Sequence, residues 1–199
     1  HIPFCKKSCH YCNFHFSTSL KYKEGMIKAI NKEIYQKAII NNDAVSTIYF
    51  GGGTPSILDV DDLNLIIENI YKNFKVGKNI EITIEANPDD LSTNKLNDLS
   101  NTKINRISIG IQSFIDKELK IMNRVHDSKK ALKSIDIAKK YFNNISVDLL
   151  YGLPDSSIKS WNYNLDVISS FNINHISAYA LTVEPKTALE SFINKSILS

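Results

Sequence analysis

The sequence predicts an α/β protein built from parallel βα units. Short runs rich in β-branched and aromatic residues alternate with longer segments in which apolar residues recur at helical spacing. This alternation repeats about six times, and strands separated by helices favour a parallel sheet. Both a doubly wound sheet and a βα barrel satisfy the pattern.

Each expected strand is a short apolar or alternating run, and most of them end at glycine, proline or a polar residue. The expected strands cover residues 1–4, 46–50, 81–85, 106–111, 144–151 and 175–183.

Apolar stripes at helical spacing predict the helices between these strands. The expected helices cover residues 27–38, 63–74, 93–99, 117–122, 132–142 and 158–168. Ser156 or Ser157 is the expected N-cap of the last of these. We expect no further element in residues 191–199.

Composition excludes several classes of protein. Hydrophobic residues make up 43% of the 199 residues, which is enough for a substantial core. The net charge of +3 is too small to indicate a nucleic-acid surface. No apolar run approaches the roughly 20 residues that a membrane helix needs. We therefore expect neither a nucleic-acid partner nor a membrane span.

Chemically distinctive residues follow the predicted strands. The cysteines of residues 5–12 follow the first strand and the glycines of residues 51–55 follow the second. Glu85, Gln112 and Asp148 lie at or near the ends of the next three strands. Because functional residues in parallel α/β folds gather where strands run into loops, we expect one convergent site.

The three cysteines, Cys5, Cys9 and Cys12, have C-x3-C-x2-C spacing. Three thiolates on one tight loop can bind three irons of a cubane iron–sulfur cluster. The fourth iron is then open to another ligand, which suits a catalytic cluster rather than an electron carrier.

Other interpretations of the cysteines remain open at this stage. A zinc site could use His1, His10 or His15 as its fourth ligand. Cys9 and Cys12 could instead form a redox pair, or the cysteines could be incidental. A zinc-binding or redox scaffold is therefore the non-enzyme alternative.

The glycine run Gly51–Pro55 is typical of a backbone that approaches a ligand without interference from Cβ atoms. It matches neither a Walker A loop nor a dinucleotide-binding fingerprint. The alternative is a plain turn in which Thr54 or Ser56 caps the following helix.

Arg124 is a candidate partner for a carboxylate of the protein or of a ligand. A buried Glu85 or Asp148 would need such a partner, so a purely structural ion pair is the alternative. We expect His126 and His175 to be structural.

The segment HIPFCKKSCHYC resembles the cysteine motif of the radical S-adenosylmethionine (SAM) superfamily. Further runs narrow the resemblance to the oxygen-independent coproporphyrinogen III oxidase family, in its heme chaperone HemW-like branch. These runs are YFGGGTPS at 49–56, EANP at 85–88, NRISIGIQSF at 105–114, VDLLYGLP at 147–154 and LTVEP at 181–185.

The resemblance implies a partial (βα)6 TIM-like barrel with parallel strands. It also implies a [4Fe-4S] cluster on Cys5, Cys9 and Cys12, with SAM bound to the fourth iron. An electron from a flavodoxin- or ferredoxin-type donor then cleaves SAM into methionine and a 5′-deoxyadenosyl radical. The protein orients and shields this cofactor chemistry.

The same resemblance implies contacts to SAM. Gly52, Gly53 and Thr54 would contact its methionine moiety. Glu85 and Arg124 would hold its charged groups, and a guanidinium suits a carboxylate.

The remaining implied contacts involve the nucleoside of SAM. Gln112 and Asp148 would bond the ribose hydroxyls, and Tyr11 would pack near the adenine. Ala180 on the last strand is a further implied contact.

Phe14 occupies the place where the oxidase branch carries an additional cysteine, which favours the chaperone branch. That branch implies binding of heme and its transfer to hemoprotein acceptors. The alternative is porphyrin biosynthesis, in which a coproporphyrinogen dehydrogenase decarboxylates coproporphyrinogen III to protoporphyrinogen IX.

We expect residues 1–199 to be the radical SAM core domain of a longer protein. The family's N-terminal residues and C-terminal domain, including its heme-binding segment, would lie outside this chain. Reduced thiolates and an oxygen-sensitive cluster imply a cytoplasmic setting.

Overall fold

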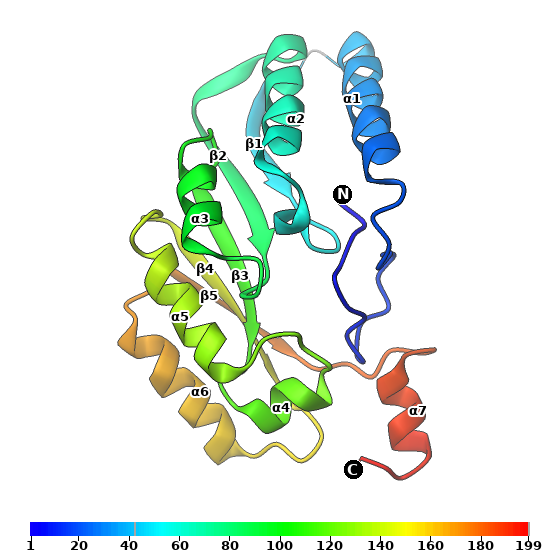
Figure 1. Cartoon of the computed structure of the whole chain (residues 1–199), viewed down its shortest axis with the longest axis vertical. Helices are drawn as coiled ribbons and strands as arrows, with labels where there is room; N and C mark the ends of the chain where they lie inside the picture. Colours follow the sequence, from blue (N-terminus) through cyan, green and yellow to red (C-terminus); the bar gives the residue numbers. More distant parts are fainter. Residues whose placement is uncertain (42, 199) are drawn as a thin grey trace.

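The computed structural model describes residues 1–41 and 43–198, which form a curled sheet of five parallel strands with helices outside it (Figure 1). Neighbouring strands follow the chain order β1-β2-β3-β4-β5. The strands are β1 (Val45–Phe50), β2 (Val76–Ala86), β3 (Arg106–Gln112), β4 (Ile145–Tyr151) and β5 (His175–Ala180). Because the strand order never reverses, the sheet is part of a barrel and not a doubly wound sheet.

Helices alternate with the strands, and most of them cover the outer face of the sheet, whereas the last lies beside the cysteine loop (Figure 1). They are α1 (Lys23–Ile40), α2 (Val60–Asn73), α3 (Thr93–Ser100), α4 (Asp116–Ile121), α5 (Ser128–Ala138), α6 (Ile158–Ser170) and α7 (Ala188–Asn194), with a 3-10 turn η1 (Pro55–Ile57). The predicted helices all form. Ser157 caps α6 through a capping box with Ser160.

The partial barrel is confirmed, but the prediction of six strands is wrong for the described residues. The first segment makes only two isolated parallel bridges, Ile2 with Gly52 and Phe4 with Ser17. The bridge at Ile2 lies beyond the last residue of β1, where the chain already turns. This segment therefore touches the rim of the sheet without extending it.

Several element boundaries also differ from the predictions, and one helix was not predicted. β2 begins at Val76, and β5 ends at Ala180. The helix α7 forms where no further element was expected. Thr187 caps it by accepting a hydrogen bond from the amide of Glu190, and Leu189 in its first turn is buried.

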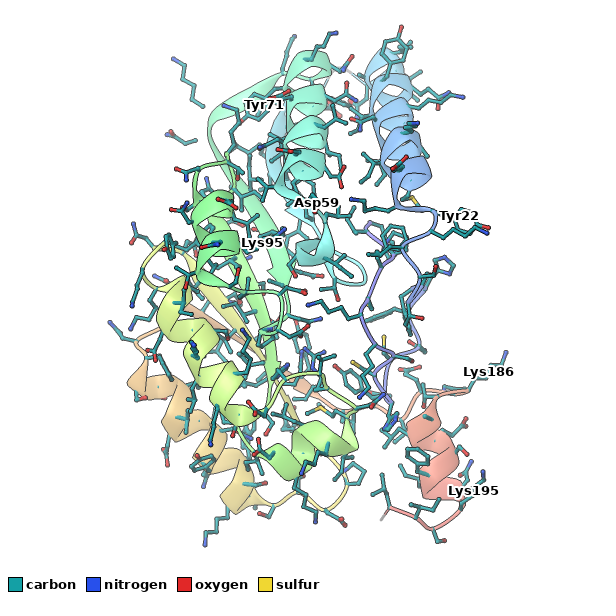
Figure 2. The ribbon with its side chains drawn as sticks, in the orientation of Figure 1. Tyr22, Asp59, Tyr71, Lys95, Lys186 and Lys195 are labelled. Carbon is teal, nitrogen blue, oxygen red and sulfur yellow. The ribbon has the colours of Figure 1, made fainter. Side chains whose placement is uncertain are left out.

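The core lies between the outer face of the sheet and the helices. It is rich in fully buried aliphatic side chains, such as Ile82, Ile84, Ile107, Ile109 and Val147. Each contributes about 1.5–3 kcal/mol through burial. Figure 2 shows the side chains that join the layers, among them Lys95, which donates from α3 to the Leu58 carbonyl.

Strand alternation turns a second, polar set of side chains to the concave face. Glu85 pairs in register with Ser108, Gly110 with Asp148, and Asp148 with Ser177. Residues in register on neighbouring strands share a face. The outward apolar core and the inward polar surface thus come from the same strands.

Along the part of the chain that the structure describes, no helix is both long enough and apolar enough to cross a membrane.

Candidate functional site

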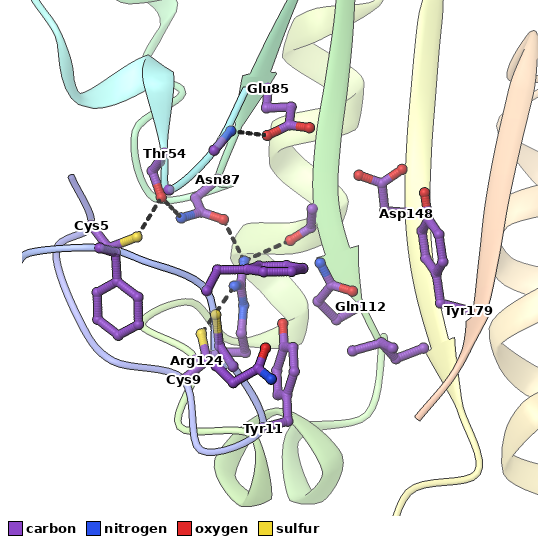
Figure 3. A pocket seen from close by; sticks show the side chains of 18 of the residues that line it. Cys5, Cys9, Tyr11, Thr54, Glu85, Asn87, Gln112, Arg124, Asp148 and Tyr179 are labelled. Carbon is purple, nitrogen blue, oxygen red and sulfur yellow. Dashed lines mark hydrogen bonds between the residues drawn. The ribbon is translucent and has the colours of Figure 1, made fainter. Parts of the chain in front are cut away.

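A cavity of about 390 Å³ lies at the C-terminal ends of the strands, between the sheet and the cysteine loop (Figure 3). All of the candidate site residues line it, although they come from distant parts of the sequence. They are Cys5, Cys9, Tyr11, Cys12, Gly52, Gly53, Thr54, Glu85, Gln112, Arg124, Asp148 and Ala180. The structure therefore brings the predicted residues together at one place.

Backbone hydrogen bonds on both sides hold the cysteine loop. The Cys5 amide donates to the Ser17 carbonyl at 3.0 Å, and the His10 amide donates to the Met122 carbonyl at 3.1 Å. Lys6 adds an ion pair to Asp89 at 2.9 Å in the loop after β2. The loop is thus fixed to the segment after β2 and to the C-terminal cap of α4.

The three thiols are free, half-buried and face the same cavity. Desolvation by burial raises the pKa of Cys5 and of Cys12. Within the described residues, no three His, Cys, Asp or Glu side chains are grouped as a single-ion site. In a cluster each cysteine binds a different iron, so thiols spread around one cavity fit that group.

The histidines proposed for a zinc site are turned elsewhere. His10 bonds the Ile121 carbonyl at 2.9 Å and stacks edge-on against Phe192. The rings of His1 and His15 do not line this cavity, and His1 bonds the His15 carbonyl at 3.3 Å. The geometry therefore gives no support to zinc.

Two positions of the loop after β1 require glycine, one for its backbone conformation and one for lack of space. Gly52 has φ of 120°, a conformation that residues with a Cβ rarely adopt. A Cβ on Gly53 would lie 2.7 Å from the Phe4 carbonyl oxygen and 3.0 Å from the Cys5 Sγ. The glycines let the loop press against the cysteine segment.

The capping interpretation of this loop is wrong. Thr54 precedes η1 but makes no side-chain cap; its hydroxyl donates to the Cys5 Sγ at 3.5 Å. Ser56 donates to Asp90 at 2.7 Å. Asp59 occupies the N-cap position of α2.

Glu85 accepts hydrogen bonds from the Tyr49 hydroxyl at 2.9 Å and from the Gly52 amide at 3.2 Å. Desolvation by burial raises the pKa of its carboxyl group above the ordinary value. This carboxylate is thus held at the cavity wall by donors and is free of ion pairs within the described chain.

Arg124 enters the cavity from the segment after α4. Its guanidinium donates to the Gly110 carbonyl at 2.8 Å, to Asn87 Oδ1 and to the Cys9 Sγ at 3.4 Å. Among the described residues no carboxylate pairs with it, which argues against the alternative of a structural ion pair. Its Nε is buried and has no hydrogen-bond partner among the described residues. The uncompensated charge fits an anionic ligand.

Gln112 has φ of 69° and lies at a register shift between β3 and β4. A non-glycine residue in this region is unfavourable, and such residues concentrate at functional sites. The bulge re-aims the Gln112 side chain toward the cavity, which Tyr11 also lines (Figure 3).

Asp148 on β4 accepts from the Ser108 hydroxyl at 3.3 Å. Burial raises the pKa of this carboxyl group, partly offset by hydrogen bonds from Ser177 and Ser108. Ala180 lies at the end of β5, opposite Tyr151. Tyr11 closes the near side by packing on a small apolar cluster that includes Leu150 and Met122.

Sequence reasoning missed several wall residues. Asn87 bonds both Thr54 and Arg124, and Tyr179 and Ser108 line the cavity from β5 and β3. The signal for Ser108 and Tyr179 was the alternation of polar residues along predicted strands, whereas Asn87 follows directly after one. His126 and His175 are structural as expected, bonding the Ile111 carbonyl and the Ser146 hydroxyl.

The model of the Radical SAM superfamily matches residues 1–166. The chain belongs to this superfamily. Membership implies SAM and a [4Fe-4S] cluster, and the three thiols around a cavity of polar and charged side chains fit both. The cavity also lies at the C-terminal ends of the strands, where the active sites of parallel βα barrels are found.

Two similar relatives carry the name heme chaperone HemW. The protein of Bacillus subtilis is 37% identical over 203 residues, covering 100% of this chain and 53% of the relative. That of Buchnera aphidicola is 40% identical over 193 residues, covering 94% and 50%. The radical SAM chain thus spans about half the length of these relatives, and the resemblance to the HemW branch is confirmed.

Solved structures agree on the fold. Coproporphyrinogen III oxidase (HemN) from Escherichia coli, described as a radical SAM enzyme, has a TM-score of 0.89 and 27% identity. The match covers 100% of this chain and 47% of that one. The archaeal Elp3 of Methanocaldococcus infernus has a TM-score of 0.70 at 19% identity and shares the fold alone.

Proposed function

We propose that this chain is the radical SAM core of a heme chaperone that resembles HemW. The intact protein would bind heme and transfer it to acceptor hemoproteins. The observation that carries the proposal is 37% identity to the Bacillus subtilis heme chaperone along the whole chain. Phe14, which is 71% exposed at the cavity wall, supports this branch because the oxidase branch is expected to have a cysteine there.

In this proposal Cys5, Cys9 and Cys12 each bind one iron, and the fourth iron is left for SAM. When bound and reduced, the cluster supplies the electron that cleaves SAM. Gly52, Gly53 and the Thr54 backbone would contact the methionine moiety of SAM. The missing Cβ of Gly53 lets this loop lie against the cysteine segment, which brings it next to the proposed cluster.

The polar wall would orient the remainder of SAM. Glu85 would accept from the amino group, and Arg124 would donate to the carboxylate. Gln112 and Asp148 would bond the ribose hydroxyls. Tyr11 and Ala180 would flank the adenine and exclude water from it.

We further propose that the protein acts in the cytoplasm, with a flavodoxin- or ferredoxin-type reductant. The support is chemical, because the cysteines must stay reduced to hold a cluster. A reducing compartment provides that condition.

Quantifying 5′-deoxyadenosine tests the site. The intact protein, reconstituted anaerobically with iron and sulfide, should form this product after reduction and addition of SAM. The variant Cys9→Ser should abolish it, and Ser8→Ala, which leaves the three thiols in place, should retain it. Equal product from Cys9→Ser and the unaltered protein would refute the assignment of the cluster ligands.

The alternative function is decarboxylation of coproporphyrinogen III to protoporphyrinogen IX. The likeness to coproporphyrinogen III oxidase from Escherichia coli favours it. Two assays on the same intact preparation separate the functions: heme-binding stoichiometry by absorbance titration, and anaerobic turnover of coproporphyrinogen III. Heme binding without turnover supports the chaperone, whereas turnover without heme binding supports the oxidase.

A further inference from the structure

Asn87 lies directly after β2, half-buried in the wall of the cavity (Figure 3). Its Nδ2 donates to the Thr54 Oγ1 at 3.0 Å, and its Oδ1 accepts from the Arg124 Nη2. Both ends of one carboxamide are therefore in use. No other polar group connects the glycine loop to Arg124 among the hydrogen bonds of the described residues.

The directions of these hydrogen bonds determine which donors are available to the cysteine sulfurs. The Thr54 hydroxyl has one proton, and its oxygen accepts from Asn87. That proton is therefore available to the Cys5 Sγ, 3.5 Å away. At the other end, Arg124 donates through Nη1 to the Cys9 Sγ at 3.4 Å. A hydrogen-bonded chain thus runs between two cysteine sulfurs and donates to both.

We propose that Asn87 is a positioning residue that aims the donors of Thr54 and Arg124 at the Cys5 and Cys9 sulfurs and so raises the reduction potential of the bound cluster. The inference rests on the proposed function only in that the cysteines hold a cluster. Hydrogen bonds to the sulfurs of an iron–sulfur centre help to set its potential. Donors stabilise the extra negative charge of the reduced form, so they favour reduction.

An amide is required at this position because it donates and accepts at once. An aspartate could only accept, so the Thr54 proton would turn from the sulfur toward the new carboxylate. Arg124 would form an ion pair with the same carboxylate. That bond would be stronger than the hydrogen bond from Arg124 to the Cys9 sulfur. A leucine of similar size would remove both bonds without adding charge.

The test is a redox titration of the cluster in the intact protein, without SAM, monitored by absorbance and electron paramagnetic resonance. The variants are Asn87→Leu, Asn87→Asp and Thr54→Val, and Asn143→Asp on the exposed surface controls for added charge. At the midpoint of the unaltered protein, Asn87→Leu should lower the reduced-to-oxidised ratio about tenfold, equivalent to about 59 mV.

Two further results are expected if the hydrogen-bonded chain acts as a unit. Thr54→Val should shift the potential in the same direction, because it removes the proton aimed at Cys5. The double variant of Asn87→Leu and Thr54→Val should shift it by less than the sum of the single shifts.

An unchanged potential in Asn87→Leu would overturn the inference, as would a shift confined to Asn87→Asp, which would reflect charge alone. Folded Asn87 and Thr54 variants that retain no cluster would also overturn it, because both residues would then serve assembly. An unaltered protein without a cluster would instead refute the proposed function.

Discussion

Gly53 lies where the glycine loop meets the cysteine segment. Its amide donates to the Ile2 carbonyl at 2.8 Å, so the backbones are already in contact. A Cβ at this position would meet the carbonyl oxygens of Phe4 and Ile2 and the Cys5 Sγ, all at 3.0 Å or less. Backbone atoms cannot rotate away as a side chain can, so one of the two segments would have to shift.

The substitution Gly53→Ala should therefore destabilise the protein by about 1–3 kcal/mol, as overpacking does, and lower its iron content after reconstitution. Urea unfolding and iron analysis measure the two effects. Gly25→Ala in α1 is the matched control, because nothing lies within 4 Å of its added Cβ. A normal iron content in Gly53→Ala would contradict the proposed close approach.

Asp148 has only hydroxyl donors within the described chain, which leaves its carboxylate able to accept from a ligand. Asp148→Asn should weaken SAM binding by roughly tenfold to a hundredfold, the cost of losing a hydrogen bond to a charged group. Isothermal titration calorimetry of the cluster-loaded protein with SAM measures the affinity. Asp166→Asn, on the exposed side of α6, is the control.

The pH dependence of this binding has a definite sign. Burial raises the pKa of Asp148, so its carboxylate becomes protonated at a higher pH than an exposed aspartate. SAM affinity of the unaltered protein should then fall on acidification at a pH above the ordinary aspartate range. Asp148→Asn should lack that part of the fall, and an identical profile would contradict the role of Asp148.

At the scale of elements, the cysteine loop is clamped between α4 and α7. The His10 amide and ring bond the carbonyls of Met122 and Ile121 at the end of α4. On the other side, the Leu189 amide of α7 donates to the His10 carbonyl at 2.8 Å, and the Phe192 ring packs edge-on against the His10 ring. A helix absent from the sequence prediction thus holds the loop that carries the thiols.

Removing this contact with Phe192→Ala should free the loop and speed release of iron to a chelator severalfold. The two rings are 5.0 Å apart and perpendicular, an arrangement worth about 0.5–1.5 kcal/mol beyond buried area. The absorbance of the iron–chelator complex follows the release. Ile197→Ala, at an apolar side chain 62% exposed, should leave the rate unchanged; equal rates in both variants would exclude the clamp.

For the whole molecule, stability should depend on pH through His126. This ring is 5% exposed, and burial lowers its pKa from 6.5 to about 4. Between these values the unfolded chain binds a proton that the native protein does not. Native stability therefore falls as the pH drops from about 6.5 toward 4.

Comparison with His126→Gln isolates this contribution. An amide can still donate to the Ile111 carbonyl but does not titrate. Between pH 7 and pH 5 the free energy of unfolding should fall by about 2 kcal/mol more in the unaltered protein than in the variant. Denaturant unfolding at both pH values measures the difference, and parallel losses would refute a neutral, buried His126.

The curled sheet also explains why the site can form. Five parallel strands turn one polar face inward and end at a common rim, where the glycine loop, Glu85, Gln112 and Asp148 meet the cysteines. Strand alternation alone separates this face from the apolar core. A shift of one residue in any strand would exchange the two faces.

The amino-acid sequence alone was enough to predict the βα alternation, all five strands of the sheet together with a sixth that does not form, and the cysteines, glycines and strand-end residues that meet at the cavity. Periodicity and turn residues are local signals, and strand ends share one rim in any parallel sheet. The short motifs around the cysteines and glycines were dense enough to indicate the family.

The contacts that those residues make depend on the folded structure. The edge segment at Ile2 and the clamp formed by α7 depend on contacts between distant parts of the chain, which periodicity does not encode. Likewise, the Thr54 hydroxyl could cap a helix or bond a thiol, and the position of Asn87 selects the thiol. The direction of a hydrogen bond follows from which partners folding brings within reach.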